Sequence, residues 1–212
     1  LAVLVAFRFR EPASGRRTRG YMMKALRAIA NPRAVWLFFS NFMGFVLLYG
    51  IIVYMPILVV QQFGLTTFHS GLAISVAAGL SALLASQAGR ISSRFSERLR
   101  VLWGFVCCGG SHLLVGTAES YPLVLGGMAL WGLGFGVLMP TLNAAAAGLV
   151  SSDLRAGVLS VFTLLIYLGQ TVSPPFFALF VEESAVRGAF FAAGSTTLVP
   201  LLFTVYMMMR KR

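Results

Sequence analysis

The chain has 212 residues, of which 58% are hydrophobic and 11% charged, and its mean hydropathy is +0.84. Soluble domains carry about 25% charged residues, so a water-soluble globular enzyme is excluded as the default class, and disorder or a disulfide scaffold is disfavoured. The net charge of +11 does not indicate a nucleic-acid binder, because the basic residues lie at the ends of apolar runs.

Runs without charge predict the fold class. No Asp, Glu, Lys or Arg occurs in 34–89, 101–118, 120–152, 156–181 or 188–209. A helix needs about 20 apolar residues to cross about 30 Å of hydrocarbon, so the first run, of 56 residues, accommodates two spans and the others one each. We therefore expect an all-α membrane protein with six transmembrane helices, at about 34–60, 70–89, 101–118, 121–149, 154–181 and 188–209.

The residues before these spans are predicted to form a helix end and a basic loop. Residues 1–7 are apolar and run directly into Arg8, whereas a signal peptide has its charge before the apolar stretch. We therefore interpret 1–7 as the end of a preceding transmembrane helix. Residues 8–33 hold eight basic residues against one acid, Glu11, and within them 20–31 is expected to form a short interfacial helix.

The distribution of Lys and Arg predicts the orientation. The segments 8–33, 90–100, 150–155 and the tail 210–212 hold 16 of the 17 basic residues. The connections on the other side hold Arg187 together with Glu119, Glu182 and Glu183. Because cytoplasmic loops carry the excess of Lys and Arg, we expect both chain ends and the basic loops to face the cytoplasm, in the plasma (inner) membrane of a prokaryote.

The cysteines and histidines do not form a predicted metal or catalytic site. Cys107 and Cys108 are adjacent, cannot form a CxxC redox pair, and are interpreted as buried small residues. His69 and His112 are far apart and have no carboxylate nearby. We therefore expect no catalytic residue, no metal and no cofactor.

The loop after the second span carries a recognisable basic motif. It reads Gly89-Arg-Ile-Ser-Ser-Arg94-Phe-Ser-Glu-Arg98 and resembles the loop motif of the major facilitator superfamily, in its weaker copy between helices eight and nine, with Ser93 in place of the motif's Asp. On this resemblance Gly89 lets two helices approach, and Arg90, Arg94 and Arg98 hold carboxylates or helix C-termini in a cytoplasmic gate. The alternative is that these arginines only set the topology.

Two stripes run along the fourth span. The first consists of residues at intervals of four that permit close helix contact or bending, namely Gly132, Gly136 and Pro140. The second is bulky with one polar end, and comprises Trp131, Phe135, Met139 and Asn143. Such a stripe faces either a solute or a neighbouring helix or lipid.

The first span carries a matching stripe of Asn41, Phe45 and Tyr49. The resemblance implies that the first and fourth helices of this half line a central cavity, which makes both bulky stripes candidate solute-binding surfaces. Aromatic rings with amide and hydroxyl groups suit an amphipathic organic solute better than a bare ion.

The fifth span contains polar and helix-bending residues. Gln170 lies deep in the span, where its amide needs a hydrogen-bond partner. We therefore expect it to form a hydrogen bond to another helix in preference to binding the solute. Gly169 permits close packing, and Pro174 with Pro175 is expected to bend the helix.

The order of these features extends the resemblance over nearly the whole chain. A Gly-rich helix with a Pro leads to an acidic–basic–Gly turn, here Asp153, Arg155 and Gly157, and then to a helix with Gly and Pro, as in helices ten and eleven of the superfamily. The resemblance implies two inverted three-helix repeats that form the C-terminal half of a transporter, with an N-terminal six-helix half as partner. It also places Asp153 and Arg155 in the cytoplasmic gate.

The function expected from this resemblance is alternating-access transport. The similarity to drug/proton antiporters favours proton-coupled efflux of a small amphipathic compound, with the coupling group in the missing half, because no charge lies within these spans. An uptake permease or facilitator is the alternative. A membrane-integral enzyme or a non-transporting scaffold is less favoured, since Glu97 and Asp153 alone do not form a catalytic cluster.

Overall fold

The computed structural model describes residues 31–181 and 186–210, so the predictions for 1–30 and for most of the tail lie outside the described residues. The described helices are α3 (Pro32–Phe63), α4 (Thr67–Ser86), α5 (Ala88–Arg94), α6 (Glu97–Gly116), α7 (Tyr121–Ala147), α8 (Ser152–Ala178), α9 (Arg187–Thr196) and α10 (Leu198–Met209). Six stretches within these residues are long and apolar enough to cross a membrane. The all-α fold class with six spans is confirmed.

The ends of α3 follow from local chemistry. The side chain of Asn31 accepts a hydrogen bond from the backbone N–H of Ala34 at 2.8 Å, and Pro32 occupies the first turn, where its missing N–H costs nothing. Gly64 ends the helix with φ of 62°, in the left-handed region that glycine adopts without strain, and its N–H bonds to the carbonyl of Val59. The span therefore continues beyond the predicted residue 60 to Phe63.

Two further boundaries differ from the sequence prediction. The segment 90–100, expected as a loop, contains most of α5 and the start of α6, where Ser96 caps the helix by accepting from the N–H of Leu99. The last span divides into α9 and α10 at Thr197, three residues before Pro200. Pro200 cannot donate to the carbonyl of Thr196, which weakens the helix at this point.

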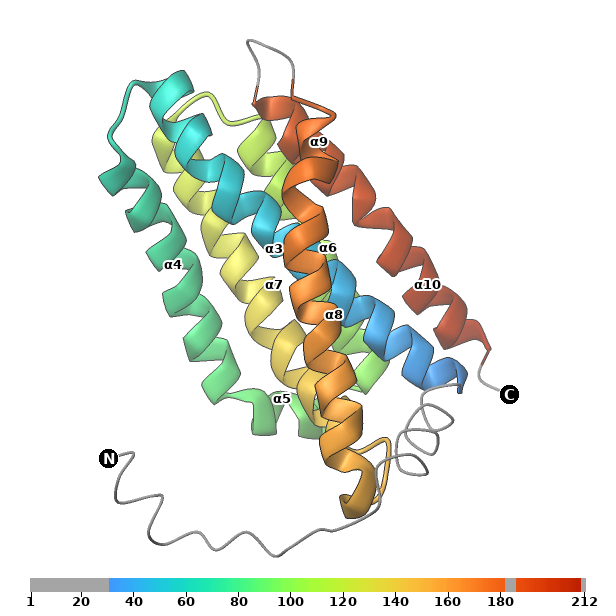
Figure 1. Ribbon diagram of the computed structural model, residues 1–212. Coiled ribbons are helices and arrows are strands. Elements are labelled where there is room, and N and C mark those ends of the chain that lie inside the picture. The colour runs from blue at the N-terminus through green and yellow to red at the C-terminus, as the bar shows by residue number, and fades with distance from the viewer. Residues whose placement is uncertain (1–30, 182–185, 211–212) are drawn as a thin grey trace, which may run out of the picture.

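In chain order the spans divide into two triplets, α3–α4–α6 and α7–α8–α9/α10, whose helices pack together in one bundle (Figure 1). The second helix of each triplet packs on the first helix of the other, since α4 contacts α7 and α8 contacts α3. Consecutive spans alternate in direction, so the two triplets run in opposite senses, as expected for inverted repeats. We call the end of the bundle formed by α5 and the starts of α3, α6 and α8 the basic end; its arginines include Arg33, Arg90, Arg94, Arg98, Arg100 and Arg155.

Burial distinguishes the helices. The apolar windows of α3 and α6 are 56% buried, whereas those of α4 and α8 are only 17% and 22% buried. Because α4 packs on α7 and α8 packs on α3, these two sparsely covered helices flank the α3–α7 pair. Helices α4 and α8 therefore present apolar surface on either side of the α3–α7 pair, and lipid or further protein must cover this surface.

Candidate functional site

A cleft of about 360 Å³ lies between α3, α4 and α7. Small side chains of α4 form one wall, and larger side chains of α3 and α7 form the rest. The lining comprises Leu48, Ile51, Ile52, Ile74, Ala77, Ala78, Ser81, Ala82, Ala85, Met128, Trp131 and Phe135. Among these residues only Ser81 and the indole of Trp131 carry a polar side-chain group, so the cleft suits an apolar or aromatic ligand surface.

Two of the aromatic residues predicted from the stripes, Trp131 and Phe135, line this cleft, and Phe45 contacts Phe135 without lining the cleft itself. Phe135 contacts Phe45 edge to face, with centroids 6.1 Å apart, and stacks on Trp131 at 5.4 Å with an interplanar angle of 20°. Trp131 in turn contacts His112 edge to face at 5.1 Å. A continuous series of rings therefore runs from α3 across α7 to the buried interior of α6.

His112 ends this series away from the cleft. The residue is fully buried, and its Nδ1 lies 2.8 Å from the carbonyl oxygen of Cys108. A carbonyl can only accept, so this contact requires a proton on Nδ1. His112 points into the bundle, against Trp131 and Phe190.

The polar members of the two stripes lie elsewhere. Asn41 is fully buried and donates from Nδ2 to the carbonyl of Phe162 on α8 at 2.9 Å, so it joins α3 to α8 and does not face the cleft. Asn143 is exposed and donates to the carbonyl of Met139 in its own helix at 2.9 Å. Tyr49 and Met139 are half-buried and do not line the cleft. The structure thus separates the amides from the aromatic surface with which the sequence grouped them.

The small stripe of α7 packs α7 directly against α4, the helix that forms one wall of the cleft. A Cβ on Gly132 would lie 2.5 Å from the carbonyl oxygen of Ala77, and one on Gly136 would lie 2.6 Å from that of Ser81. Both distances are too short for real contacts, so these glycines allow α7 to pack directly on α4. Pro140, the third member, is half-buried inside α7.

The α3–α8 contact uses a similar close approach with added hydrogen bonds. A Cβ on Gly169 would lie 2.7 Å from the carbonyl oxygen of Phe42. Ser173 donates to the carbonyl of Val46 at 2.6 Å, and the hydroxyl of Tyr54 donates to the carbonyl of Pro174 at 2.7 Å. Gln170 is half-buried and makes no hydrogen bond within the described residues, so Ser173 and Tyr54 provide the cross-helix bonds that were expected of it.

The residues of the predicted gate lie at the basic end. A Cβ on Gly89 would meet nothing within 4 Å, so this glycine does not permit a close helix contact among the described residues. Arg90 donates to Gln87 at 2.9 Å, Arg94 is exposed, and Arg98 is half-buried. At the nearby turn Arg155 is exposed, and the side chain of Asp153 lies outside the described residues.

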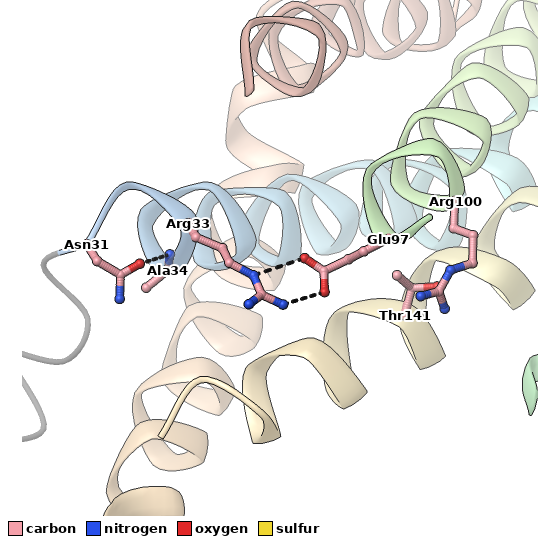
Figure 2. A network of polar contacts seen from close by, with 6 residues as sticks. All are labelled: Asn31, Arg33, Ala34, Glu97, Arg100 and Thr141. Atoms are coloured by element: carbon pink, nitrogen blue, oxygen red, sulfur yellow. Dashed lines mark hydrogen bonds and ion pairs between the residues drawn. The ribbon is translucent and has the colours of Figure 1, made fainter. Parts of the chain in front are cut away.

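An ion pair that the sequence did not suggest joins α3 to α6 at this end. Arg33 donates to both carboxylate oxygens of Glu97, from Nε at 3.2 Å and from Nη2 at 2.7 Å (Figure 2).

Within 31–181 and 186–210, no group of three or more His, Cys, Asp or Glu side chains could hold a metal ion.

Comparison with known proteins identifies the family. The family model of the Major Facilitator Superfamily matches residues 1–174. A curated relative, the uncharacterized MFS-type transporter YvkA of Bacillus subtilis (strain 168), is 23% identical over 162 residues, which are 75% of this chain and 34% of the relative.

Two solved structures share the fold. A mutant of the peptide transporter POT in complex with sulfate superposes with a TM-score of 0.69 at 23% identity, covering 82% of this chain and 37% of that one. A bacterial homolog of the human lysosomal transporter Spinster, inward-facing and unoccupied, has a TM-score of 0.64 at 15% identity and covers 97% of this chain and 54% of that one. The chain thus spans between a third and about half of these proteins, and with the family model matching most of its residues, it belongs to the Major Facilitator Superfamily.

Proposed function

We propose that this chain forms the C-terminal six-helix half of a secondary transporter that works by alternating access, and that the α3–α4–α7 cleft is its share of a central solute site. The aromatic surface of that cleft carries the proposal, since Trp131 and Phe135 line it beside the sparsely covered helix α4. A second six-helix half is the proposed partner, because relatives about twice as long contain a match to this chain.

The proposed solute is a small amphipathic organic compound. Apolar and aromatic side chains dominate the cleft, and no charged side chain lines it. One structural neighbour is named a peptide transporter, but a peptide has two charged termini that this half of the site would leave uncompensated. A compound with an aromatic ring matches the half-buried ring of Phe135, which the buried Trp131 backs, better.

Proton-coupled efflux is the proposed mode, with the coupling group in the other half. The charge-free runs leave no carboxylate in the spans of this chain, and His112 is fully buried behind Trp131 and does not itself line the cleft. Because no carboxylate lies in these spans, a second candidate is a facilitator, which moves its solute down a gradient.

The proposed location is the plasma membrane, with the basic end in the cytoplasm. Cysteines that replace Arg94 and Glu119, both exposed and at opposite ends of the bundle, test this orientation. In intact cells, an impermeant thiol reagent should label the Glu119 site and spare the Arg94 site. The native Cys107 and Cys108 are buried and give a low background in the parent protein.

Transport by the full-length protein in proteoliposomes tests the function. We would measure ethidium, glucose and a dipeptide with and without an imposed pH gradient, against protein-free liposomes. Coupled export predicts gradient-driven movement of ethidium that an uncoupler abolishes. Equilibration that ignores the gradient would instead support the facilitator. Movement of glucose or the dipeptide without movement of ethidium would contradict the proposed solute class, and no flux above the protein-free control for any of the three would contradict transport.

A further inference from the structure

A second apolar groove lies at the basic end, apart from the α3–α4–α7 cleft, which we call the solute cleft. It has a volume of about 360 Å³ and is lined by residues that include Ile91 and Phe95 around α5, Leu99, Arg100 and Trp103 of α6, and Val137 of α7. It shares no lining residue with the solute cleft. Its role can therefore be tested independently of the solute.

The groove combines open apolar side chains with a single charge. Phe95 and Trp103 are 50% and 53% exposed. A tryptophan at the end of a membrane span is typical of the interface between lipid tails and headgroups. The apolar floor therefore lies where an acyl chain passes, and Arg100 lies at the level of the headgroups.

Arg100 has no counter-ion within the described residues. Its Nη1 donates to the hydroxyl of Thr141 at 3.1 Å, while its Nε is buried and has no hydrogen-bond partner. Glu97 lies one turn away on the same helix but is turned toward Arg33, with Arg100 directed to the other side, toward α7 (Figure 2). A partly buried charge without a counter-ion is costly, so an anion beside Arg100 would stabilise the protein.

The surroundings of the groove are also positive. Arg90 and Arg94 of α5 are exposed beside it, and Glu97 is the only acid in residues 88–118. We propose that the groove binds one anionic phospholipid, with an acyl chain along Phe95, Trp103 and Val137 and the headgroup phosphate at Arg100. The apolar lining favours a lipid over free phosphate, and the excess of arginines favours an anionic lipid over a zwitterionic one.

Trp103 provides a direct readout, because bromine on an acyl chain quenches tryptophan fluorescence at contact. In the full-length protein with all other tryptophans, including Trp36 and Trp131, replaced by Phe, we would compare quenching by brominated phosphatidylglycerol and brominated phosphatidylcholine. We expect roughly fivefold tighter association of the anionic lipid at Trp103, the factor expected for one basic residue at the membrane surface. Arg100→Gln should remove this preference, and Arg155→Gln, which neutralises an exposed arginine on α8, should leave it unchanged.

A second tryptophan position provides the control for general lipid contact. Val106→Trp in a Trp103→Phe background places the probe one turn further along α6, at a residue that is 51% exposed. Quenching there should not distinguish the two lipids. If the variant lacking other tryptophans fails to fold, the difference in quenching between the parent protein and Trp103→Phe gives the same quantity. Equal quenching of Trp103 by both lipids, or quenching by neither because protein covers the groove, would overturn the proposal.

Discussion

Phe45 of α3 and Phe135 of α7 meet edge to face beside the α3–α4–α7 cleft, with ring centroids 6.1 Å apart and planes at 80°. The two residues belong to different triplets of the inverted repeat. Their contact therefore couples the aromatic surface of the cleft to the packing between the triplets, and Trp131 extends this surface by stacking on Phe135.

This contact predicts an energetic coupling between the two rings. Edge-to-face pairs contribute about 0.5–1.5 kcal/mol beyond their buried area, so Phe45→Leu and Phe135→Leu should be non-additive by about that amount in a double-mutant cycle of unfolding in detergent. Phe68, which is 74% exposed on α4, serves as the control partner. The cycle of Phe45→Leu with Phe68→Leu should be additive, and equal coupling in both cycles would contradict a specific contact.

Two glycines of α7 should respond differently to the same substitution. A side chain on Gly132 would strike the backbone of Ala77, whereas a Cβ on Gly126 meets nothing within 4 Å. Gly132→Val should therefore separate α7 from α4, lowering the midpoint of thermal unfolding and the yield of folded protein. Gly126→Val should leave both near the parent values, apart from a small gain in helix propensity, because glycine is the poorer helix former. A similar loss for both variants would exclude close packing as the cause.

The two asparagines are predicted to differ in role. Asn41→Ala removes a buried hydrogen bond to Phe162 between α3 and α8 and should cost about 1 kcal/mol of stability, while Asn143→Ala removes a bond within its own exposed turn. Chemical unfolding in detergent should show the loss for Asn41→Ala and little change for Asn143→Ala. If Asn41→Ala instead alters the ranking of transported solutes at unchanged stability, Asn41 contacts the solute after all.

Arg187 holds the end of the bundle opposite the basic end. It donates from Nε to Gln62 at 2.8 Å and from Nη2 to the carbonyl of Ala118 at 2.7 Å, so one guanidinium joins α3, the end of α6 and α9. Arg187→Met should lower the thermal midpoint, and Arg187→Lys should restore it only in part, because an ammonium lacks the planar fork. Full rescue by lysine would mean that charge alone matters.

The spans and the aromatic surface could be predicted because both depend on periodicity along one chain segment. A run without charge marks a span, and spacing by three or four residues placed Trp131 and Phe135 on one face. Close packing at Gly132 and Gly136 also followed, since residues without a bulky side chain at this spacing permit helix approach.

Properties that depend on partners distant in the sequence could not be predicted. Periodicity placed Asn41 on the same face of α3 as Phe45. It could not show that α8 packs over Asn41 and accepts its hydrogen bond. The pair of Arg33 and Glu97 joins residues 64 positions apart, and no local pattern indicates it. Helix α5 was missed because the basic segment was interpreted as a loop, either a gating motif or a topology signal.

The most direct test of the account is the solute ranking of Phe135→Ala in the full-length transporter, corrected for membrane expression. We would compare transport of ethidium, tetraphenylphosphonium and a neutral aromatic compound, with Gly132→Val as the packing control. If Phe135 contacts the solute, its loss should change the relative transport of these compounds by roughly fivefold or more, the factor for about 1 kcal/mol of lost aromatic contact, whereas Gly132→Val should scale all three alike. A common factor for all three compounds in Phe135→Ala as well would contradict the proposal that the α3–α4–α7 cleft binds the solute.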